Sequence, residues 1–140
     1  MNALHKKRYP TQHVIDKMRS HFRYLRGVNV MLDVNHTYDA DLDVFLIGPD
    51  GTRVELFTDI PGLGFVNTVL DDEAGMPITD GEYPFTGSYE PEGSLAALAG
   101  HASGDWTLEI SDDTRRDSGT LNSWSLEIAT YLPPAMPAIT

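Results

Sequence analysis

Acidic side chains are the densest set of residues in this sequence that could take part in chemistry. Calcium takes about six to eight oxygen ligands, often carboxylates from several loops, and clustered carboxylates repel one another unless a cation lies between them. The chain carries three acidic groups: Asp39, Asp41 and Asp43; Asp71, Asp72 and Glu73; and Asp112, Asp113 and Asp117. The hypothesis that follows is a calcium site between the loop at Asp41 and the loop at Asp71–Glu73, with Asp112 as a further candidate ligand.

The same residues have a second interpretation, as turn residues. Aspartate favours turns because its short carboxylate accepts hydrogen bonds from nearby backbone N–H groups. The sequence has no EF-hand pattern, so any calcium ligands come from segments that are far apart in the chain. Both interpretations stay open at the level of the sequence.

Charge is distributed unevenly along the 140 residues, whose formal net charge is -11. Seven of the ten basic residues lie in the first 26 positions, so the rest of the chain holds three basic and twenty acidic residues. A field this negative excludes nucleic acid, whose phosphates require lysine and arginine. It favours a divalent cation or a basic partner, although an acidic surface also simply keeps a secreted domain soluble. The absence of cysteine excludes a disulfide framework and thiolate metal sites.

Neither a membrane span nor a leader is recognisable. No stretch approaches the roughly 20 apolar residues that cross a bilayer. The first 26 residues are basic and lack an apolar core, so no signal peptide is visible in the chain. We expect an extracellular or cell-surface location as part of a larger protein.

Apolar residues recur with a period of two from Phe22 onward, which predicts half-buried strands. The Gly48-Pro49-Asp50-Gly51 tetrad predicts a tight turn between two of them. Residues 58–104 are rich in glycine and proline, with a short helical turn expected around Ser94–Ala99. The expected strands include Val28–Val34, Leu42–Leu46, Thr52–Phe57, Trp106–Ile110 and Trp124–Ile128.

Six to eight short strands with turns between them predict an all-β fold, an antiparallel β-sandwich or jelly roll. We expect three parts: a basic N-terminal segment (1–21), the sandwich (22–131), and a Pro/Ala-rich tail or linker (132–140). Residues Thr11–Arg26 fit either a basic amphipathic helix or a strand. Trp106 and Trp124 alternate in phase with apolar neighbours, so we expect both in the structural core.

Short motifs recur in a fixed order along most of the chain, each at an expected turn or strand. Together they resemble the P/Homo B domain, the proprotein convertase P-domain of kexin- and furin-like subtilisin proteases, in its bacterial form. The resemblance runs from Val28 to Ile128, and the residues ahead of it are basic and differ from the family pattern. The motifs are Val30-x-Leu32-x-Val34-x-His36-Thr37-Tyr38, Asp41-Leu42, Leu46-Ile47-x-Pro49-x-Gly51-Thr52, Asp71-Asp72-Glu73-Ala74, Gly87-x-Tyr89-x-Pro91-x-Gly93-x-Leu95, Gly104-x-Trp106-Thr107-Leu108, Asp112, and Gly119-Thr120-Leu121-x-x-Trp124-x-Leu126.

This resemblance implies a sandwich of the galactose-binding-domain-like type. It also implies a non-catalytic accessory domain that supports the folding, stability and maturation of a subtilisin-like serine endopeptidase. Its implied partner is the catalytic domain in cis, or another protein. The alternative is a protein- or glycan-binding module of an exported or surface protein. Tyr83, Phe85 and Tyr89 are its candidate aromatics, unless they cover the edge of the sandwich.

Catalytic machinery is not expected. A protease triad needs a nucleophile, a histidine base and an orienting acid, and no stretch resembles the sequence around a subtilisin catalytic residue. His36 ends a predicted strand, where a lone histidine is more often packed or hydrogen-bonded than a base or a metal ligand.

Overall fold

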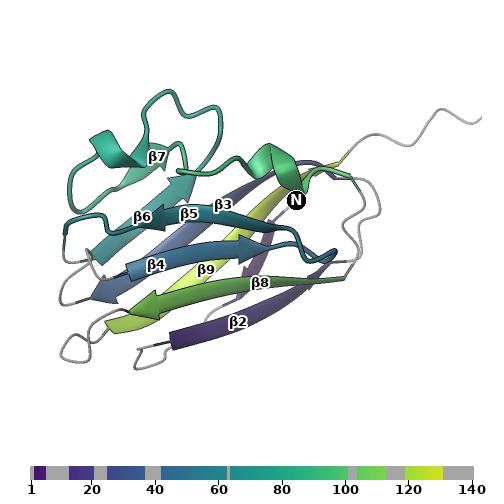
Figure 1. Cartoon of the computed structure of the whole chain (residues 1–140), viewed down its shortest axis with the longest axis horizontal. Helices are drawn as coiled ribbons and strands as arrows, with labels where there is room; N and C mark the ends of the chain where they lie inside the picture. The colour runs from purple at the N-terminus through teal and green to yellow at the C-terminus, as the bar shows by residue number, and fades with distance from the viewer. Residues whose placement is uncertain are drawn as a thin grey trace, which may run out of the picture.

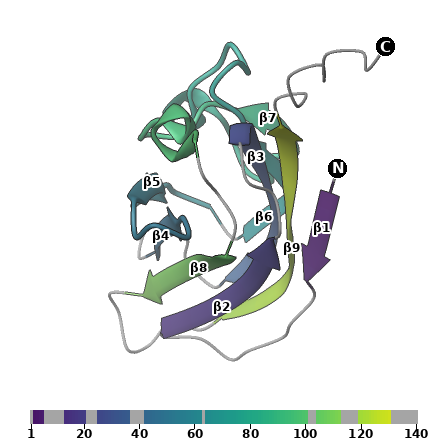
Figure 2. The same cartoon turned by 90° about the vertical axis from the view of Figure 1, so that its right-hand side faces the viewer.

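The chain forms two facing β-sheets in a computed structural model that describes residues 2–5, 13–20, 25–36, 42–62, 64–100, 104–112 and 119–130. Figures 1 and 2 show the two layers. The five-stranded sheet has the order β1-β9-β3-β6-β7, and the four-stranded sheet has the order β2-β8-β4-β5. The strands are β1 (Asn2–His5), β2 (His13–Ser20), β3 (Leu25–His36), β4 (Leu42–Ile47), β5 (Arg53–Thr58), β6 (Gly64–Leu70), β7 (Gly87–Tyr89), β8 (Gly104–Asp112) and β9 (Gly119–Thr130).

The predicted all-β sandwich is confirmed. Neighbouring strands pair antiparallel, except that β7 runs parallel to β6. The turn between β4 and β5 falls where the Gly-Pro-Asp-Gly tetrad predicts it, and the Gly51 N–H donates to the Gly48 carbonyl at 3.0 Å. Gly51 has a φ of 91°, a conformation that glycine adopts without a steric penalty.

The core fills the space between the sheets with the inward residues of each strand. On β4 the burial alternates strictly between buried and half-buried positions, as a two-residue period requires. Trp106 and Trp124 are 0% and 1% exposed and are the two largest fully buried side chains among the described residues. The Trp106 Nε1 group has no hydrogen-bond partner within the part of the chain that the structure describes.

The region before Val28 contributes strands to both sheets. All eight residues of β2 pair with β8, and β1 pairs with β9. Of the two interpretations of residues 11–26, the helix is therefore wrong for His13–Ser20. Pairing with β8 satisfies the backbone groups on one side of this edge strand, and such tertiary pairing overrides a weak local preference for helix.

The segment between β6 and β8 closes one side of the sandwich. Its backbone reaches both sheets: β7 joins β6, while the N–H groups of Glu92 and Gly93 donate to the Leu56 and Glu55 carbonyls on the outer edge of β5. A covered edge is protected from pairing with other chains. Two 3-10 turns lie in this segment, η2 (Ile78–Asp80) and η3 (Leu95–Leu98), and η3 confirms the helical turn expected around Ser94–Ala99.

Candidate functional site

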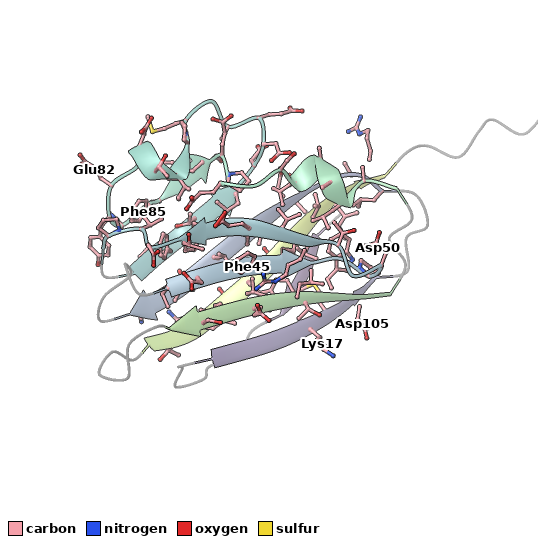
Figure 3. All side chains as sticks on the ribbon, viewed as in Figure 1. Lys17, Phe45, Asp50, Glu82, Phe85 and Asp105 are labelled. Carbon is pink, nitrogen blue, oxygen red and sulfur yellow. The ribbon has the colours of Figure 1, made fainter. Side chains whose placement is uncertain are left out.

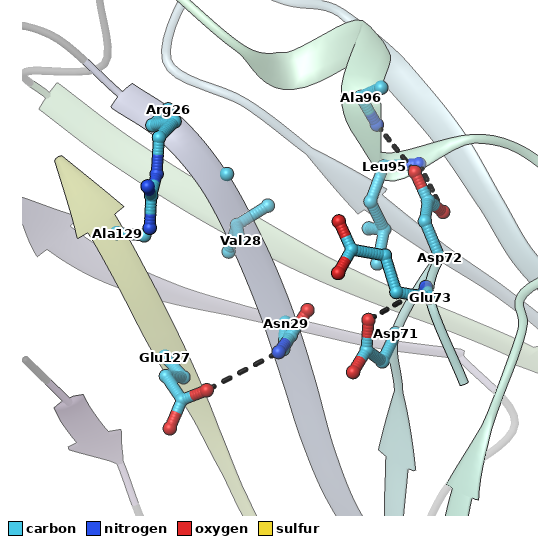
Figure 4. Close-up of a pocket in the computed structure, with 11 residues that line it drawn as sticks. Arg26, Val28, Asn29, Asp71, Asp72, Glu73, Leu95, Ala96, Glu127 and Ala129 are labelled. Atoms are coloured by element: carbon cyan, nitrogen blue, oxygen red, sulfur yellow. Dashed lines mark hydrogen bonds between the residues drawn. The ribbon is translucent and has the colours of Figure 1, made fainter. Parts of the chain in front are cut away.

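A groove of about 520 Å³ lies on the outside of the five-stranded sheet, between that sheet and the turn that follows β6 (Figure 4). Its walls come from segments that are far apart in the sequence: residues 26–29 of β3, residues 71–73 of the turn, the start of η3, and Glu127 and Ala129 of β9. The acidic run Asp71–Glu73, which the sequence singled out, thus lines this groove.

Asp72 anchors one wall of this groove. Its Oδ1 accepts a hydrogen bond from the Leu95 N–H at 2.9 Å, and its Oδ2 accepts from the Ala96 N–H at 2.9 Å and from the Ser94 hydroxyl at 3.3 Å. The first N–H groups of a helical turn have no partner inside the turn, so an outside carboxylate caps them. Asp72 therefore fixes η3 against the turn at residues 71–73.

Asp71 and Glu73 use their carboxylates differently. The Asp71 Oδ1 accepts a hydrogen bond from the Glu73 N–H at 2.8 Å, which tightens the turn locally. The Glu73 side chain is exposed and extends into the groove (Figure 4). This turn accordingly combines two carboxylates that hold the backbone with one that faces solvent.

The opposite wall is formed by β3 and β9. The Asn29 side-chain amide donates to the Glu127 Oε1 at 3.3 Å across the strand pair, and these two residues are directly opposite each other in the β3–β9 register. Arg26 is exposed at the end of this wall. The groove thus carries four carboxylates and one guanidinium.

The proposed calcium ligands do not all lie in one place. Asp71, Asp72 and Glu73 lie together in the groove, whereas the backbone of Asp112 pairs with Leu42 where β8 leads toward β9. The β3 strand measures the separation of the two regions. At one end, His36 pairs with Gly119, the first residue of β9. Six positions away on β3, Val30 pairs with Leu70, the residue just before the 71–73 turn. Six residues span about 20 Å of strand, so the 71–73 turn and the Asp112 backbone lie toward different ends of the sandwich.

Asp41 and the side chains of Asp112 and His36 lie outside the described residues. Among the residues that are described, no group of three or more histidine, cysteine, aspartate or glutamate side chains is arranged to hold a metal ion. Since calcium requires about six to eight oxygens, the described residues alone do not fit a calcium shell.

The aromatic residues of the middle segment pack inward. Phe85, labelled in Figure 3, is 1% exposed. It stacks on Phe65 with ring centroids 4.8 Å apart, and Tyr89 meets the Phe85 ring edge-on at 6.1 Å. Tyr83 is 51% exposed. Two of the three candidate glycan-binding aromatics therefore cover the core, which leaves no exposed aromatic cluster among them.

Sequence reasoning missed Asn29, Glu127 and Arg26 as groove residues. Their alternation with buried neighbours indicates only that Asn29 and Glu127 point outward. Which outward residues meet depends on the β3–β9 register, and the two residues are 98 positions apart.

No helix within the described ranges is long and apolar enough to span a membrane.

This chain is similar to known proteins in sequence and in fold. The family model described as the proprotein convertase P-domain matches residues 25–128. Proteins named calcium-dependent protease from Nostoc sp. and Trichormus variabilis are 30% and 29% identical over 105 residues, which is 74% of this chain and 14% of each protease. The chain thus spans a small part of the length of these relatives.

Two solved structures share the fold. The serine protease of Aeromonas sobria in complex with its chaperone has a TM-score of 0.57 and 17% identity, over 95% of this chain and 28% of that one. The serine protease of Aeromonas sobria has a TM-score of 0.53 and 18% identity, over 94% and 27%. These two structures show the fold, and the family match, which covers most of the chain, confirms the predicted kinship. The chain belongs to the proprotein convertase P-domain family, whose members are non-catalytic accessory domains of serine proteases.

Proposed function

We propose that this domain stabilises a subtilisin-like serine protease catalytic domain carried by the same polypeptide and assists its maturation outside the cell. The observation that supports this proposal is the match of residues 25–128 to the P-domain family, in relatives named as proteases of which the matched segment is only 14%. The remaining length of such relatives leaves room for a catalytic domain.

The architecture suits a supporting role. One cluster of buried apolar side chains, with members from Met18 to Ile128, joins the two sheets. The domain can therefore dock on a neighbour as a single rigid body. A surface that buries part of a neighbouring domain raises that domain's stability, because it binds the folded state and not the unfolded one. Chemistry on a substrate is not required for this effect.

Grafting tests the proposal. The 105-residue matched segment of the Nostoc calcium-dependent protease is replaced by this chain, and the yield of mature, active protease is compared with that of a version lacking the segment. We expect the graft to restore maturation at least in part. A graft carrying Trp124→Ala is the matched control, because it disrupts the core but leaves the outer surface unchanged. Equal yields from the graft and the deletion would contradict the proposal.

We also propose that the domain binds calcium, with Asp41, Asp71, Asp72, Glu73 and Asp112 as candidate ligands. The names of the relatives and the density of carboxylates support this proposal. On the 71–73 turn, both Asp72 oxygens already accept backbone hydrogen bonds, so a cation shares Asp72 with these N–H groups, whereas Glu73 faces solvent.

Titration calorimetry tests calcium binding directly. We expect heat on adding calcium to the chain and a melting temperature that falls when EDTA is added. Asp112→Asn and Glu73→Gln separate the two regions, because each variant removes a ligand from one of them. An absence of heat, together with a melting temperature that EDTA does not change, would exclude the site.

A further inference from the structure

The groove continues across the outer face of the five-stranded sheet. A smaller hollow of about 80 Å³ adjoins it, and the two share Asn29 and Glu127 as lining residues. The smaller hollow is lined by Met31 and Val69, and Met31 is 43% exposed. The two adjoining hollows, together called the track, place an apolar shelf at Met31 and Val69 on one side of the Asn29–Glu127 pair and the carboxylates of the 71–73 turn on the other.

The floor of this track is open. Gly27 lines the groove, and a Cβ atom added there would meet nothing within 4 Å. Ala96 and Ala129 also line the groove, and each of them adds only one methyl group. The track is thus open above Gly27, where no side chain from another part of the described residues lies within 4 Å of the added Cβ position.

The charge of the track is unbalanced. Glu73 and Glu127 are both exposed, and no ion pair joins them to Arg26 or to another cation among the described residues. The wall that carries Glu73 is held in place by three hydrogen bonds to Asp72. A preformed negative surface next to an apolar shelf complements a segment with alternating basic and apolar side chains.

We propose that this track is the docking site for a basic, extended segment of the neighbouring catalytic domain. A lysine or arginine of that segment lies between Glu73 and Glu127, where it competes with calcium for Glu73, and an adjacent apolar side chain lies on Met31 and Val69. The identity of the partner rests on the proposed function. The chemistry of the occupant rests on the track itself.

A peptide titration tests the chemistry on the chain as it stands. An end-blocked peptide of alternating valine and arginine is added to isotope-labelled protein, and backbone amide shifts are followed by NMR. We expect saturable shifts at residues 27–31, 71–73 and 125–129. A peptide of alternating valine and glutamate should produce none of them.

Variants sharpen this test. Gly27→Gln fills the floor and should weaken binding at least fivefold, whereas Gly27→Ala adds only one methyl group and should leave most of the binding intact. The double variant Glu73→Gln with Glu127→Gln should weaken binding about fivefold, since each exposed ion pair contributes modestly. Its matched control is Asp80→Asn with Glu82→Gln, which removes the same charge from two exposed positions that do not line the track. Glu82 is labelled in Figure 3.

Three results would overturn the docking site: shifts spread over all acidic surfaces, equal weakening by both double variants, or no saturable binding. Each is separable from a failure of the proposed function. A graft that matures normally with Gly27→Gln would reject this track and retain the accessory role. A graft that never matures, while the peptide binds in the track, would reject the catalytic domain as the partner.

Discussion

The two faces of β3 have opposite chemistry. Val30 and Leu32 point between the sheets and are 0% exposed, whereas Asn29 and Met31 point outward and line the concave track. The inward set is defined by size and apolarity alone, so it specifies the fold. The outward set is free of that constraint, and in this domain it carries the charge and the open space of the track.

The largest expected effect comes from breaking the inner face. Trp124, which pairs with Leu32 across β3 and β9, is 1% exposed. Trp124→Ala should lower the free energy of unfolding by about 3–5 kcal/mol, because it removes a large buried side chain and leaves a cavity. Urea unfolding measures this change. Met31→Ala, on the outer face of β3, should lower the free energy of unfolding by less than about 1 kcal/mol. Equal losses in the two variants would contradict the difference between the inner and outer faces.

The second effect concerns the segment that supports the groove wall and covers the edge of β5. A Cβ atom on Gly93 would lie 2.8 Å from the Glu55 carbonyl oxygen, so Gly93→Ala should cost about 1–3 kcal/mol by overpacking. Gly27→Ala is the control, since its added methyl group meets no atom. Thermal unfolding of both variants decides the matter, and an unchanged melting temperature in Gly93→Ala would mean that this contact is not tight.

The third effect separates two neighbouring acids of the groove. Asp72→Ala removes the cap of η3 and should cost about 0.5–2 kcal/mol, while Glu73→Ala should change stability by no more than about 0.5 kcal/mol. Hydrogen exchange of the Leu95 and Ala96 amides reports the loss of the cap. If Glu73→Ala proves as costly as Asp72→Ala, then Glu73 has a structural role that its exposure does not indicate.

The smallest effect depends on pH and lies away from the groove, at the β4–β5 turn (Figure 3). The Thr52 backbone N–H donates to Asp50 at 2.9 Å and lowers the pKa of that carboxyl below its ordinary value of 3.8. Because the folded-state pKa is depressed, the charged form stabilises the fold above pH 3.8, and the gain is lost as the pH falls through the folded pKa. Melting temperatures of the wild type and Asp50→Asn should therefore differ slightly at neutral pH and converge in acid. A constant difference would contradict this assignment.

The inner face was predictable from the sequence because alternation with a period of two reports directly on burial. This alternation predicted the strands that carry Trp106 and Trp124, and the Gly-Pro-Asp-Gly tetrad predicted the turn at Gly48–Gly51. The strand β2 was not predictable, since its basic residues fit a helix equally well and only pairing with β8 selects the strand.

The groove was predictable only in part. Asp71, Asp72 and Glu73 stood out by their density, and the turn interpretation describes Asp71 well. The cap that Asp72 provides for η3 spans more than twenty residues, and the Asn29–Glu127 contact depends on strand register. Neither leaves a local signal in the sequence.

The thermal stability of an attached protease tests the central claim most directly. The half-life of proteolytic activity at raised temperature is measured for the Nostoc calcium-dependent protease with this chain grafted in place of its matched segment, and for the version without the segment. If the domain stabilises its neighbour, the half-life of the graft should be longer than that of the version without the segment. The graft with Trp124→Ala should have a shorter half-life than the intact graft. Identical half-lives for the graft and the deletion, with the grafted domain itself folded, would contradict the account.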